Sequence, residues 1–466
     1  MSASTNPDSL SWNSQFHIVL ADLERRRVLL LPGNPGGTLP SLRVEKHLWV
    51  GDSHEILSLL RERLGLGGNF TVLRYLRMDL HEEKKWVRVW LVLELHEKLT
   101  EPPLNGYWME RQALIKGSLA DEESRALLLA YLDGEAAGQI VPLRAPWAAP
   151  GWFSQASQWM TETLTTLGRA PTGAVQQFRN LGISSLLRVA TATGLVYCKA
   201  TADLPLFVNE AVLMESLAAR FPGQIPLPLA IERAKRWMLL DNFGPSLRDA
   251  RAEDADIAGF VAQFGKMQAQ TAGMVDQLLA LGCIDRRLPV LTAQIDILTA
   301  HPLTAQYIQS KDLAQLQALA PALKERCADL ARYHLPATLA HGDLHLGNVA
   351  RGEQGYLFFD WSDSCIAHPF VDMIAPYFFY DDAATQAQMR DDYLTQWSEW
   401  ESMDRLLEVW RLAKPLAALH QAVSYLHILI GQEELIHSEM ADGLQEFIAY
   451  TISSIAEKER PQPKNV

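Results

Sequence analysis

Cysteine is scarce in this sequence: four are spread over 466 residues, and no two of them form a C-x-x-C pair. This spacing provides neither a zinc or redox motif nor a disulfide framework. Long apolar runs are lacking too, because no stretch approaches the roughly 18 apolar residues that a membrane helix requires. The first residues, MSASTNPDSLSWNSQF, have no basic region and no apolar core, so we expect no signal peptide. These absences favour a soluble cytoplasmic protein.

Positive charge is also in deficit, since 42 Lys and Arg residues face 55 Asp and Glu residues, a formal net charge of −13. Nucleic acids and anionic membranes both require a basic surface, so we expect neither as a partner. A cationic small-molecule substrate is compatible with this charge. Acidity that serves solubility alone explains the charge equally simply.

The composition, 48% hydrophobic and 21% charged, is that of a globular protein. At roughly 150 residues per domain, the length predicts two or three domains. Prolines and a glycine crowd the segment 142–152, PLRAPWAAPGW, and interrupt regular structure there. We therefore predict an α+β protein with an accessory domain in 1–141, a Pro- and Trp-rich linker in 142–164, and two further parts in 165–244 and 245–460.

The first 141 residues combine strand and helix patterns. The segment 53–64, SHEILSLLRERL, carries an apolar stripe at helical spacing, and we expect Ser53 to cap this helix and Gly65 to end it. Segments rich in alternating Val, Leu and Trp predict strands. The expected strands are 16–20, 28–31 and 84–95, the first two forming a hairpin, and a second helix is expected at 121–132.

The order of these elements and the ending RERLGL resemble a Nudix domain, whose helix holds Mg²⁺ with several glutamates. Arg63 takes the place of one of these glutamates, and Val44 and Val50 replace the initial glycine and the upstream glutamate of the motif. The resemblance therefore implies a Nudix-like scaffold without hydrolase activity, and an unrelated α+β accessory domain is the alternative. The positions that agree with the motif are Leu60, Glu62, Gly65 and Leu66.

The segment 339–372 is the most informative part of the chain. It contains HGDLHLGN at 341–348, then an apolar strand at 356–359, then Asp360. Asp343 and Asn348 are five residues apart, which is the spacing of the catalytic Asp and metal-binding Asn in a kinase catalytic loop, and Asp360 stands where a second metal ligand follows the next strand.

Phosphoryl transfer explains this spacing. The reaction needs a carboxylate that orients the acceptor hydroxyl and accepts its proton, and Asp343 is the candidate. It also needs hard oxygen ligands that place Mg²⁺ between the β- and γ-phosphates, and Asn348 and Asp360 are the candidates. We expect Gly347 to allow the tight turn before Asn348.

This segment closely resembles the aminoglycoside phosphotransferase-like family of small-molecule kinases, which includes choline kinase-like proteins. The resemblance rests on the HGDxHxxN loop, with Gly342 where protein kinases have Arg, and on the Asp360-Trp361 pair. It implies a bilobal kinase-like fold and a requirement for ATP and Mg²⁺. It also implies that His341 holds the loop rather than zinc and that Asp372 braces it.

The resemblance implies an ATP-binding lobe in 165–244. Residues 177–199 predict three strands with short turns, and the turn Asn180–Ser185, with Ser184 and Ser185, takes the place of the phosphate-covering loop. Lys199 ends the third strand, where the family has a lysine that contacts the phosphates and pairs with a glutamate of the next helix. Glu210 fits that glutamate better than its rival Glu215.

Two further parts of the nucleotide and acceptor sites are expected. By position, the carbonyl of Leu240 and the N–H of Asn242 would contact adenine. The helical part, 245–460, would hold the acceptor, and Asp363 is expected to be a solvated turn residue rather than part of the metal region. Candidates for lining the acceptor site are Trp397, Trp400, Trp410, His420, Tyr425, Glu433 and Glu434, with Asp381, Asp382, Asp391 and Asp392 favouring a cation.

The sequence therefore predicts an ATP- and Mg²⁺-dependent kinase of a small molecule: an aminoglycoside, sugar, amino alcohol or nucleoside. A nucleotide-sensing pseudokinase that acts through its N-terminal domain is the alternative, although the set of catalytic residues is complete. A kinase of protein substrates is less expected, because no APE-like segment follows Asp360. A Nudix hydrolase is the least expected of all.

Overall fold

The computed structural model describes residues 12–456 except 34–35, 68, 82, 98–100, 118, 120, 137, 139–140, 252–253 and 374–382. Its contacts divide the chain into two compact units, Met1–Cys198 and Lys199–Val466. The division falls inside one strand, β10 (Gly194–Thr201). This division does not test the domain boundaries expected at residues 141, 164 and 244, which stay predictions.

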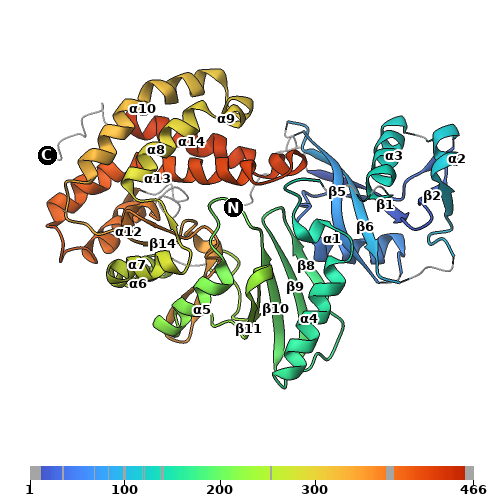
Figure 1. The fold of residues 1–466 in the computed structure, drawn as a ribbon, viewed down its shortest axis with the longest axis horizontal. Coiled ribbons are helices and arrows are strands. Elements are labelled where there is room, and N and C mark those ends of the chain that lie inside the picture. The colour runs from blue at the N-terminus through green and yellow to red at the C-terminus, as the bar shows by residue number, and fades with distance from the viewer. Residues whose placement is uncertain are drawn as a thin grey trace, which may run out of the picture. The chain divides into compact units, whose positions relative to one another are not determined.

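A seven-stranded mixed sheet forms the core of the N-terminal region (Figure 1). Its central strand, β1 (Asn13–Asp22), forms the expected hairpin with β2 (Arg27–Pro32) and lies parallel to β6 (Trp86–Leu95), which matches the third expected strand. The long strand β5 (Phe70–His81) completes the order β3-β2-β1-β6-β5 and was not predicted. The short strands are β3 (Gly37–Thr38), β4 (Ser41–Val44) and β7 (Tyr107–Glu110).

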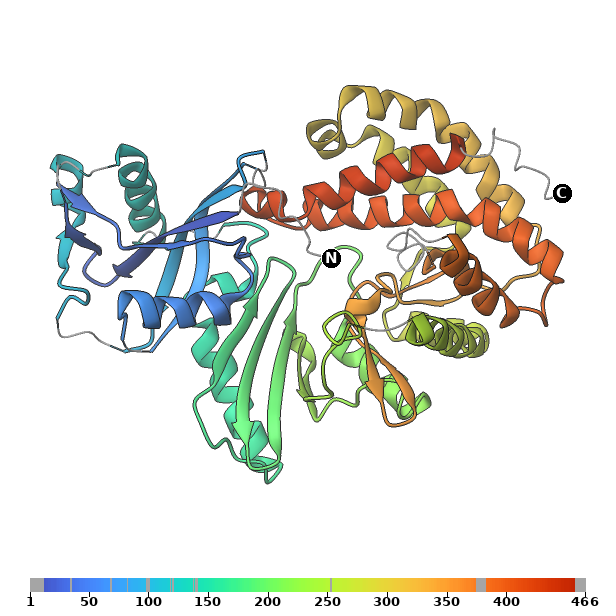
Figure 2. The same cartoon turned by 180° about the vertical axis from the view of Figure 1, so that it is seen from behind.

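Two helices lie on opposite sides of this sheet (Figures 1 and 2). One is α3 (Glu122–Ala136), the second expected helix, whose Leu128 and Leu132 belong to the same buried apolar cluster as Val28 and Trp90. The other is α1 (Ser53–Leu64), which has the expected bounds. A short helix, α2 (Arg111–Lys116), precedes α3.

The two ends of α1 differ in how well they were predicted. Gly65 ends the helix as expected, with φ of 66° and its N–H donating to the carbonyl of Leu60. The cap prediction was wrong by one residue: Asp52 is the N-cap, without a side-chain hydrogen bond, and Ser53 is the first helical residue. Ser53 is fully buried, so its side chain faces the core instead of the exposed helix end.

The expected linker is largely helical. The one-turn helix η1 (Pro146–Ala148) is followed by α4 (Trp152–Thr166), a 15-residue helix that the sequence analysis did not name. All the prolines of the segment precede Gly151, which has φ of 86° and forms the N-cap of α4. Proline therefore interrupts only the approach to α4, and its face of Trp152, Phe153, Ala156, Met160 and Leu164 is buried.

A five-stranded sheet with the order β11-β12-β10-β9-β8 follows. It contains the three strands and two turns expected between 177 and 199, so this part of the predicted fold is confirmed. Besides β10, the strands of the sheet are β8 (Gln176–Asn180), β9 (Ser184–Thr191), β11 (Ala230–Glu232) and β12 (Trp237–Asp241).

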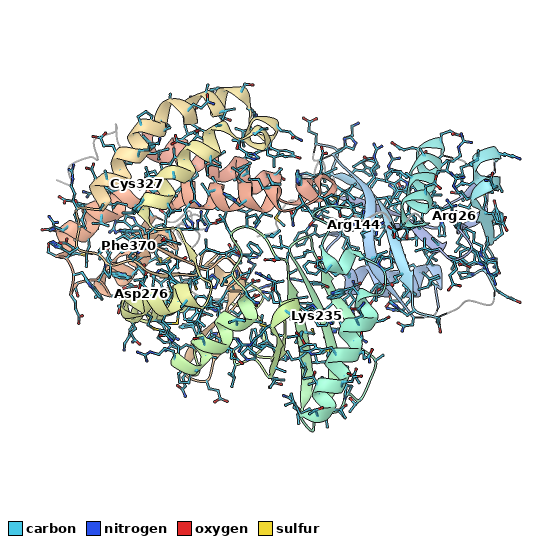
Figure 3. All side chains as sticks on the ribbon, in the orientation of Figure 1. Arg26, Arg144, Lys235, Asp276, Cys327 and Phe370 are labelled. Atoms are coloured by element: carbon cyan, nitrogen blue, oxygen red, sulfur yellow. The ribbon has the colours of Figure 1, made fainter. Side chains whose placement is uncertain are left out.

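The rest of the second unit is mainly helical, as predicted. Its longest helix, α13 (Met403–Ile430), runs beside α14 (Ala441–Ala456) (Figures 1 and 2). Phe370, labelled in Figure 3, contacts the rings of Tyr393, Trp397 and Trp410 in the core. The other helices of eight or more described residues are α5 (Glu210–Arg220), α6 (Asp254–Gln270), α8 (Leu288–Ala300), α10 (Ser310–Leu330) and α12 (Ala383–Thr395).

Two observations bear on the absences noted in the sequence. The four cysteines are buried and unpaired. Among the described residues, no helix is both long and apolar enough to cross a membrane.

Candidate active site

Lys199 lies near the end of β10, and its side chain is 9% exposed. Its ammonium contacts both carboxylate oxygens of Glu210, at 2.9 and 2.8 Å, and Oδ1 of Asp360 at 2.7 Å. Burial alone would lower the pKa of Lys199, but the two carboxylates outweigh it and raise the pKa above its usual value. The lysine therefore stays charged in a buried position.

Glu210 is the first residue of α5 and is almost completely buried. Besides Lys199, its carboxylate accepts hydrogen bonds from the Thr201 hydroxyl at 2.9 Å and the Trp361 N–H at 3.0 Å. Glu215, the rival partner for Lys199, pairs instead with Arg233 at 2.6 Å on the surface. The structure thus brings Asp360 together with Lys199 and Glu210, which precede it by 150 residues or more.

The loop that carries Asp343 leaves the buried strand β14 (Thr338–Ala340) and turns into the one-turn helix η4 (Leu346–Asn348). The Asn348 amide donates to the backbone carbonyl of Asp343 at 2.9 Å and to its Oδ2 at 3.1 Å. The Asp343 side chain is 43% exposed. The five-residue spacing therefore folds the loop back, so that Asn348 orients the carboxylate of Asp343.

His345 adds a second contact to Asp343, which the sequence analysis did not foresee. Its Nδ1 accepts the N–H of Gly347 at 2.9 Å and faces Arg248 at 3.0 Å, so Nε2 carries the proton toward Asp343 Oδ2 at 3.4 Å. Burial raises the pKa of Asp343, but the hydrogen bonds from His345 and Asn348 hold that pKa below its usual value. The carboxylate is therefore ionised and can accept a proton.

Asp372 braces the loop through its backbone. Its two carboxylate oxygens accept the N–H groups of His341 and Gly342, at 2.9 and 2.8 Å, and the Gln268 amide donates to it at 3.0 Å. The His341 ring faces the carbonyl of Phe359 at 3.0 Å, and burial lowers its pKa to about 4, so it stays neutral. These contacts agree with a structural role for His341 and Asp372.

Two glycines of the loop are required by close approach. Gly342 has φ of 86°, and a Cβ there would lie 2.2 Å from the backbone oxygen of Asp363, so only glycine fits. Gly347 lies in the one-turn helix η4, where the tight turn before Asn348 was expected, and it does not have a positive φ. A Cβ at Gly347 would instead lie 2.6 Å from the His345 ring, so glycine permits the contact between His345 and Asp343.

Asp360 follows β16 (Gly355–Phe358) and has φ of 67°, a left-handed conformation that is uncommon for a residue other than glycine. Such conformations persist where the surroundings hold them, often at functional sites. Oδ1 of Asp360 accepts hydrogen bonds from Lys199 and from the Ser362 hydroxyl at 3.2 Å, and the side chain is 40% exposed. Burial raises the pKa of Asp360, but the charge of Lys199 outweighs it and keeps the carboxyl ionised.

The donor set at Asp360 and Asn348 fits Mg²⁺, which prefers carboxylate and amide oxygens. Among the described residues, no group of three or more His, Cys, Asp or Glu side chains could hold a metal by itself. A magnesium site here would therefore need Asn348 and the oxygens of a bound nucleotide besides Asp360. This is the usual situation for Mg²⁺, which binds proteins through one or two carboxylates together with substrate phosphates.

The part of the chain that carries this geometry, residues 205–408, matches the family model described as "Phosphotransferase enzyme family". Residues 205–408 are therefore similar to phosphotransferase enzymes. The match includes Glu210, Asp343, Asn348 and Asp360, and it begins six residues after Lys199. No curated protein matches the chain.

Several solved structures are similar to the chain, at low sequence identity and low TM-score. A macrolide 2'-phosphotransferase type I is 14% identical, with 63% of this chain and 97% of that chain covered and a TM-score of 0.45. A choline/ethanolamine kinase family protein from Mesorhizobium loti is 16% identical, with 66% and 96% covered and a TM-score of 0.46. Choline kinase LicA from Streptococcus pneumoniae is 12% identical, with 64% and 98% covered and a TM-score of 0.45. At these scores, the similarity says nothing about the acceptor. The Nudix resemblance of the N-terminal region finds no support among these comparisons.

The expected nucleotide contacts lie in two places. Ser184 and Ser185 begin β9, where the backbone carbonyl of Ser184 accepts the Leu181 N–H at 2.8 Å and the buried Ser185 hydroxyl donates to Arg179 O at 3.3 Å. Leu240 is buried in β12. Asn242 follows β12, and its side chain accepts the Gly244 N–H at 3.2 Å.

Four of the residues expected to line the acceptor site pack against other side chains of the helical part. Trp397 and Trp410 are buried in the core around Phe370, and His420 is buried beside Cys365. Their aromatic spacing reflects helix packing, which a sequence pattern does not separate from ligand contact. Trp400 packs on Trp397, and Asp381 and Asp382 lie outside the described residues.

Tyr425, another residue expected to line the acceptor site, interacts electrostatically with Asp343 of the catalytic loop. Burial raises the pKa of Tyr425, and the negative charge of Asp343 raises it further. Asp363 itself is half-buried, not solvated as expected, and burial together with the charges of Asp343 and Asp360 raises its pKa to about 8. Asp363 therefore belongs to the electrostatic surroundings of the site.

Sequence analysis missed several residues that support the loop. Gln421 of α13 donates to the carbonyl of Gly342 at 2.5 Å, and Gln268 of α6 bonds Asp372. Both are buried polar residues within apolar helical faces. A lone glutamine on an apolar face is the signal that could have identified them, because a buried amide needs partners.

Proposed function

We propose that this phosphotransferase uses ATP and Mg²⁺ to phosphorylate a hydroxyl group of a small molecule, such as an aminoglycoside, sugar, amino alcohol or nucleoside. The observation that carries the proposal is the joining of Lys199 to both Glu210 and Asp360. A buried lysine held by two carboxylates, of which one is 40% exposed, is suited to anionic phosphates with a bound cation.

Asp343 acts on the acceptor in this proposal. Its ionised carboxylate accepts the proton of the acceptor hydroxyl while the hydroxyl oxygen attacks the γ-phosphorus and the bond from that phosphorus to the leaving oxygen of ADP breaks. Asn348 and His345 hold the carboxylate in one orientation, which reduces the reorganisation required during the reaction. Asp372 and Gln421 hold the loop backbone below it.

Lys199 and the metal ligands act on the nucleotide. The Lys199 ammonium donates to the phosphates, while Glu210 keeps the ammonium at the end of β10. Asn348 and Asp360 would hold Mg²⁺, which when bound neutralises phosphate charge and orients the transferred group. Leu240 O and Asn242 N–H would bind adenine, and the turn before Ser184 and Ser185 would lie against the phosphates.

Among these acceptors, we favour those that carry a positive charge. The ionised carboxylates of Asp343 and Asp360 give the site a negative potential, which together with burial raises the pKa of Asp363 to about 8. A negative site attracts an amine-bearing acceptor and raises its local concentration. High salt should therefore raise the KM of a cationic acceptor more than that of a neutral one.

The test is Mg–ATP-dependent release of ADP with pooled aminoglycosides, sugars, amino alcohols and nucleosides, with the Asp343→Asn variant run beside the wild type. Release that requires both an acceptor pool and Asp343 supports the proposal. Binding of Mg–ATP without such release would contradict phosphotransfer to these acceptors and would favour the alternative, a nucleotide sensor.

A further inference from the structure

The N-terminal region contacts the turn between β8 and β9 through several specific groups. Contacts assign β8, β9 and most of β10 to the same compact unit as the N-terminal sheet. The turn itself contains one internal hydrogen bond, from Leu181 N–H to Ser184 O at 2.8 Å. Groups of the first 150 residues complete the hydrogen bonds on either side of that bond.

The side chain of Gln177, in β8, bonds the backbone of β5 in the way that a neighbouring strand would. Its side-chain oxygen accepts the N–H of Val72 and its amide donates to the carbonyl of the same residue, both at 2.9 Å. Both residues are buried. The register of β5 with β6 shifts between Val72 and Arg74, and that of β8 with β9 shifts between Gln177 and Arg179, so both strands bulge at this junction. Bulges are typical where a strand departs from ordinary pairing to direct a group elsewhere.

The turn is held at two successive backbone groups. The N–H of Asn180 donates to the carbonyl of Gly51 at 3.0 Å, and the carbonyl of Leu181 accepts the indole N–H of Trp147 at 2.6 Å. Gly51 is buried against the turn, since a Cβ there would lie 2.1 Å from Leu181 Cδ2. The hydrogen bonds of Gly51 and Trp147 therefore fix the entry into the turn.

Trp147 is itself anchored to the N-terminal sheet. The guanidinium of Arg74, in β5, donates to the carbonyl of Ala148 at 2.9 Å and forms an ion pair with Glu135 of α3. The side chains of Arg74 and Glu135 are largely buried. A continuous set of contacts thus leads from α3 through β5 and η1 to Leu181.

We propose that the N-terminal region positions this turn for the nucleotide phosphates, with Trp147 and Gly51 as positioning residues; the inference rests on the proposed function. Among the hydrogen bonds of the described residues, the N–H groups of Gly182 and Ile183 at the tip of the turn have no partner. Successive backbone N–H groups of this kind bind phosphate oxygens. A turn fixed from outside is already in the binding conformation, so nucleotide binding does not lose the entropy of ordering it.

Trp147→Phe tests the proposal, because it keeps the aromatic packing and removes only the donor to Leu181. Gly51→Ala tests it independently by displacing the Leu181 side chain. Each change should raise the KM for ATP, and the dissociation constant of Mg–ATP in calorimetry, about 3- to 10-fold, the range for one hydrogen bond. The KM of the acceptor and kcat should stay within twofold.

Two control variants separate positioning from stability. Gly67→Ala places a methyl group in open space in the same region and should leave the KM for ATP unchanged. Trp152→Phe alters the ring that packs edge-on against Trp147, at 6.1 Å, and should lower the melting temperature without raising the KM for ATP.

The outcomes distinguish the two proposals. Unchanged ATP binding in Trp147→Phe and Gly51→Ala would overturn the positioning role, and so would a KM for ATP that rises equally in Trp152→Phe. A wild type that binds Mg–ATP without transferring phosphate would contradict the proposed function alone, because calorimetry would still measure the effect of Trp147. A wild type that does not bind Mg–ATP would contradict both.

Discussion

At the scale of single residues, the site is defined by ionised side chains that specific partners hold in place. Asp360 combines a left-handed backbone with a carboxylate shared between Lys199 and Ser362. Asp343 is ionised and oriented, with Asn348 and His345 as its partners. Each group is placed for a charged ligand, and each can be changed with little alteration of shape.

Asp343→Asn should lower kcat about 10²- to 10⁴-fold, the usual loss for a general base, because the amide cannot accept the hydroxyl proton. The dissociation constant of Mg–ATP should stay within about threefold. Steady-state ADP release and calorimetry measure the two quantities. Asp404→Asn, which changes an exposed residue at the start of α13, is the matched control. Full turnover in Asp343→Asn would remove Asp343 from the mechanism.

His368 links the residue scale to pH. Its Nδ1 accepts the N–H of Phe370 at 3.2 Å as a cap, and burial lowers its pKa to about 3. The unfolded chain binds a proton at this histidine below about pH 6.5 whereas the folded chain does not, so acidification favours unfolding. In His368→Asn, which keeps a capping oxygen, the loss of stability on acidification should be smaller by at most about 1.4 kcal/mol per pH unit.

Urea unfolding of the wild type and His368→Asn at pH 7, 6 and 5 measures this difference. The unfolding free energy of the wild type minus that of His368→Asn should decrease as the pH falls. Parallel curves would show that His368 is not held neutral by the fold.

At the scale of elements, local signals were predictable and long-range ones were not. The bounds of α1 follow from an apolar stripe and a glycine stop, and β8, β9 and β10 follow from short turns between apolar segments. Helix α4 was hidden by the prolines before it, although its own sequence contains none. The first register shift of β5 lies at Val72, whose backbone bonds Gln177, over a hundred residues away, and no local pattern encodes such a partner.

The end of α1 offers a test of a local signal. Gly65 has φ of 66° and open space around it, so Gly65→Ala adds no clash but forces alanine into the left-handed region. It should lower the free energy of unfolding by about 1 kcal/mol. Gly67→Ala, also in open space but without a positive φ, should change it by less than about 0.5 kcal/mol. Equal effects in chemical denaturation would contradict the cap geometry.

At the scale of the whole molecule, the candidate catalytic groups come from one compact unit. Lys199, Glu210, Asp343, Asn348 and Asp360 all lie in 199–466. The spacing within HGDLHLGN predicted the part of the site that is local in sequence. The supporting contacts of Gln268, Gln421 and Arg248 could not be predicted from the sequence. They join segments that are 104, 79 and 97 residues apart, and no motif connects these segments.

Ligand-linked stability reports on this unit as a whole. Mg–ATP at about 100 times its dissociation constant should stabilise the wild type by about 2.7 kcal/mol and raise its melting temperature. Asp360→Asn should lose most of this shift, since asparagine tolerates the left-handed backbone but carries no charge for the cation. Asp343→Asn should keep it. An undiminished shift in Asp360→Asn would exclude Asp360 as the metal ligand.

The most direct test of the central claim is transfer of radiolabelled γ-phosphate from ATP to a small-molecule acceptor. The pooled acceptors are incubated with Mg–ATP and the wild type, Asp343→Asn or Asp360→Asn, and the labelled products are separated from ATP and phosphate. We predict a labelled acceptor with the wild type and at least a hundredfold less with either variant, in line with the loss of a catalytic group. Label that appears only in inorganic phosphate, or equal labelling by wild type and Asp343→Asn, would contradict the account.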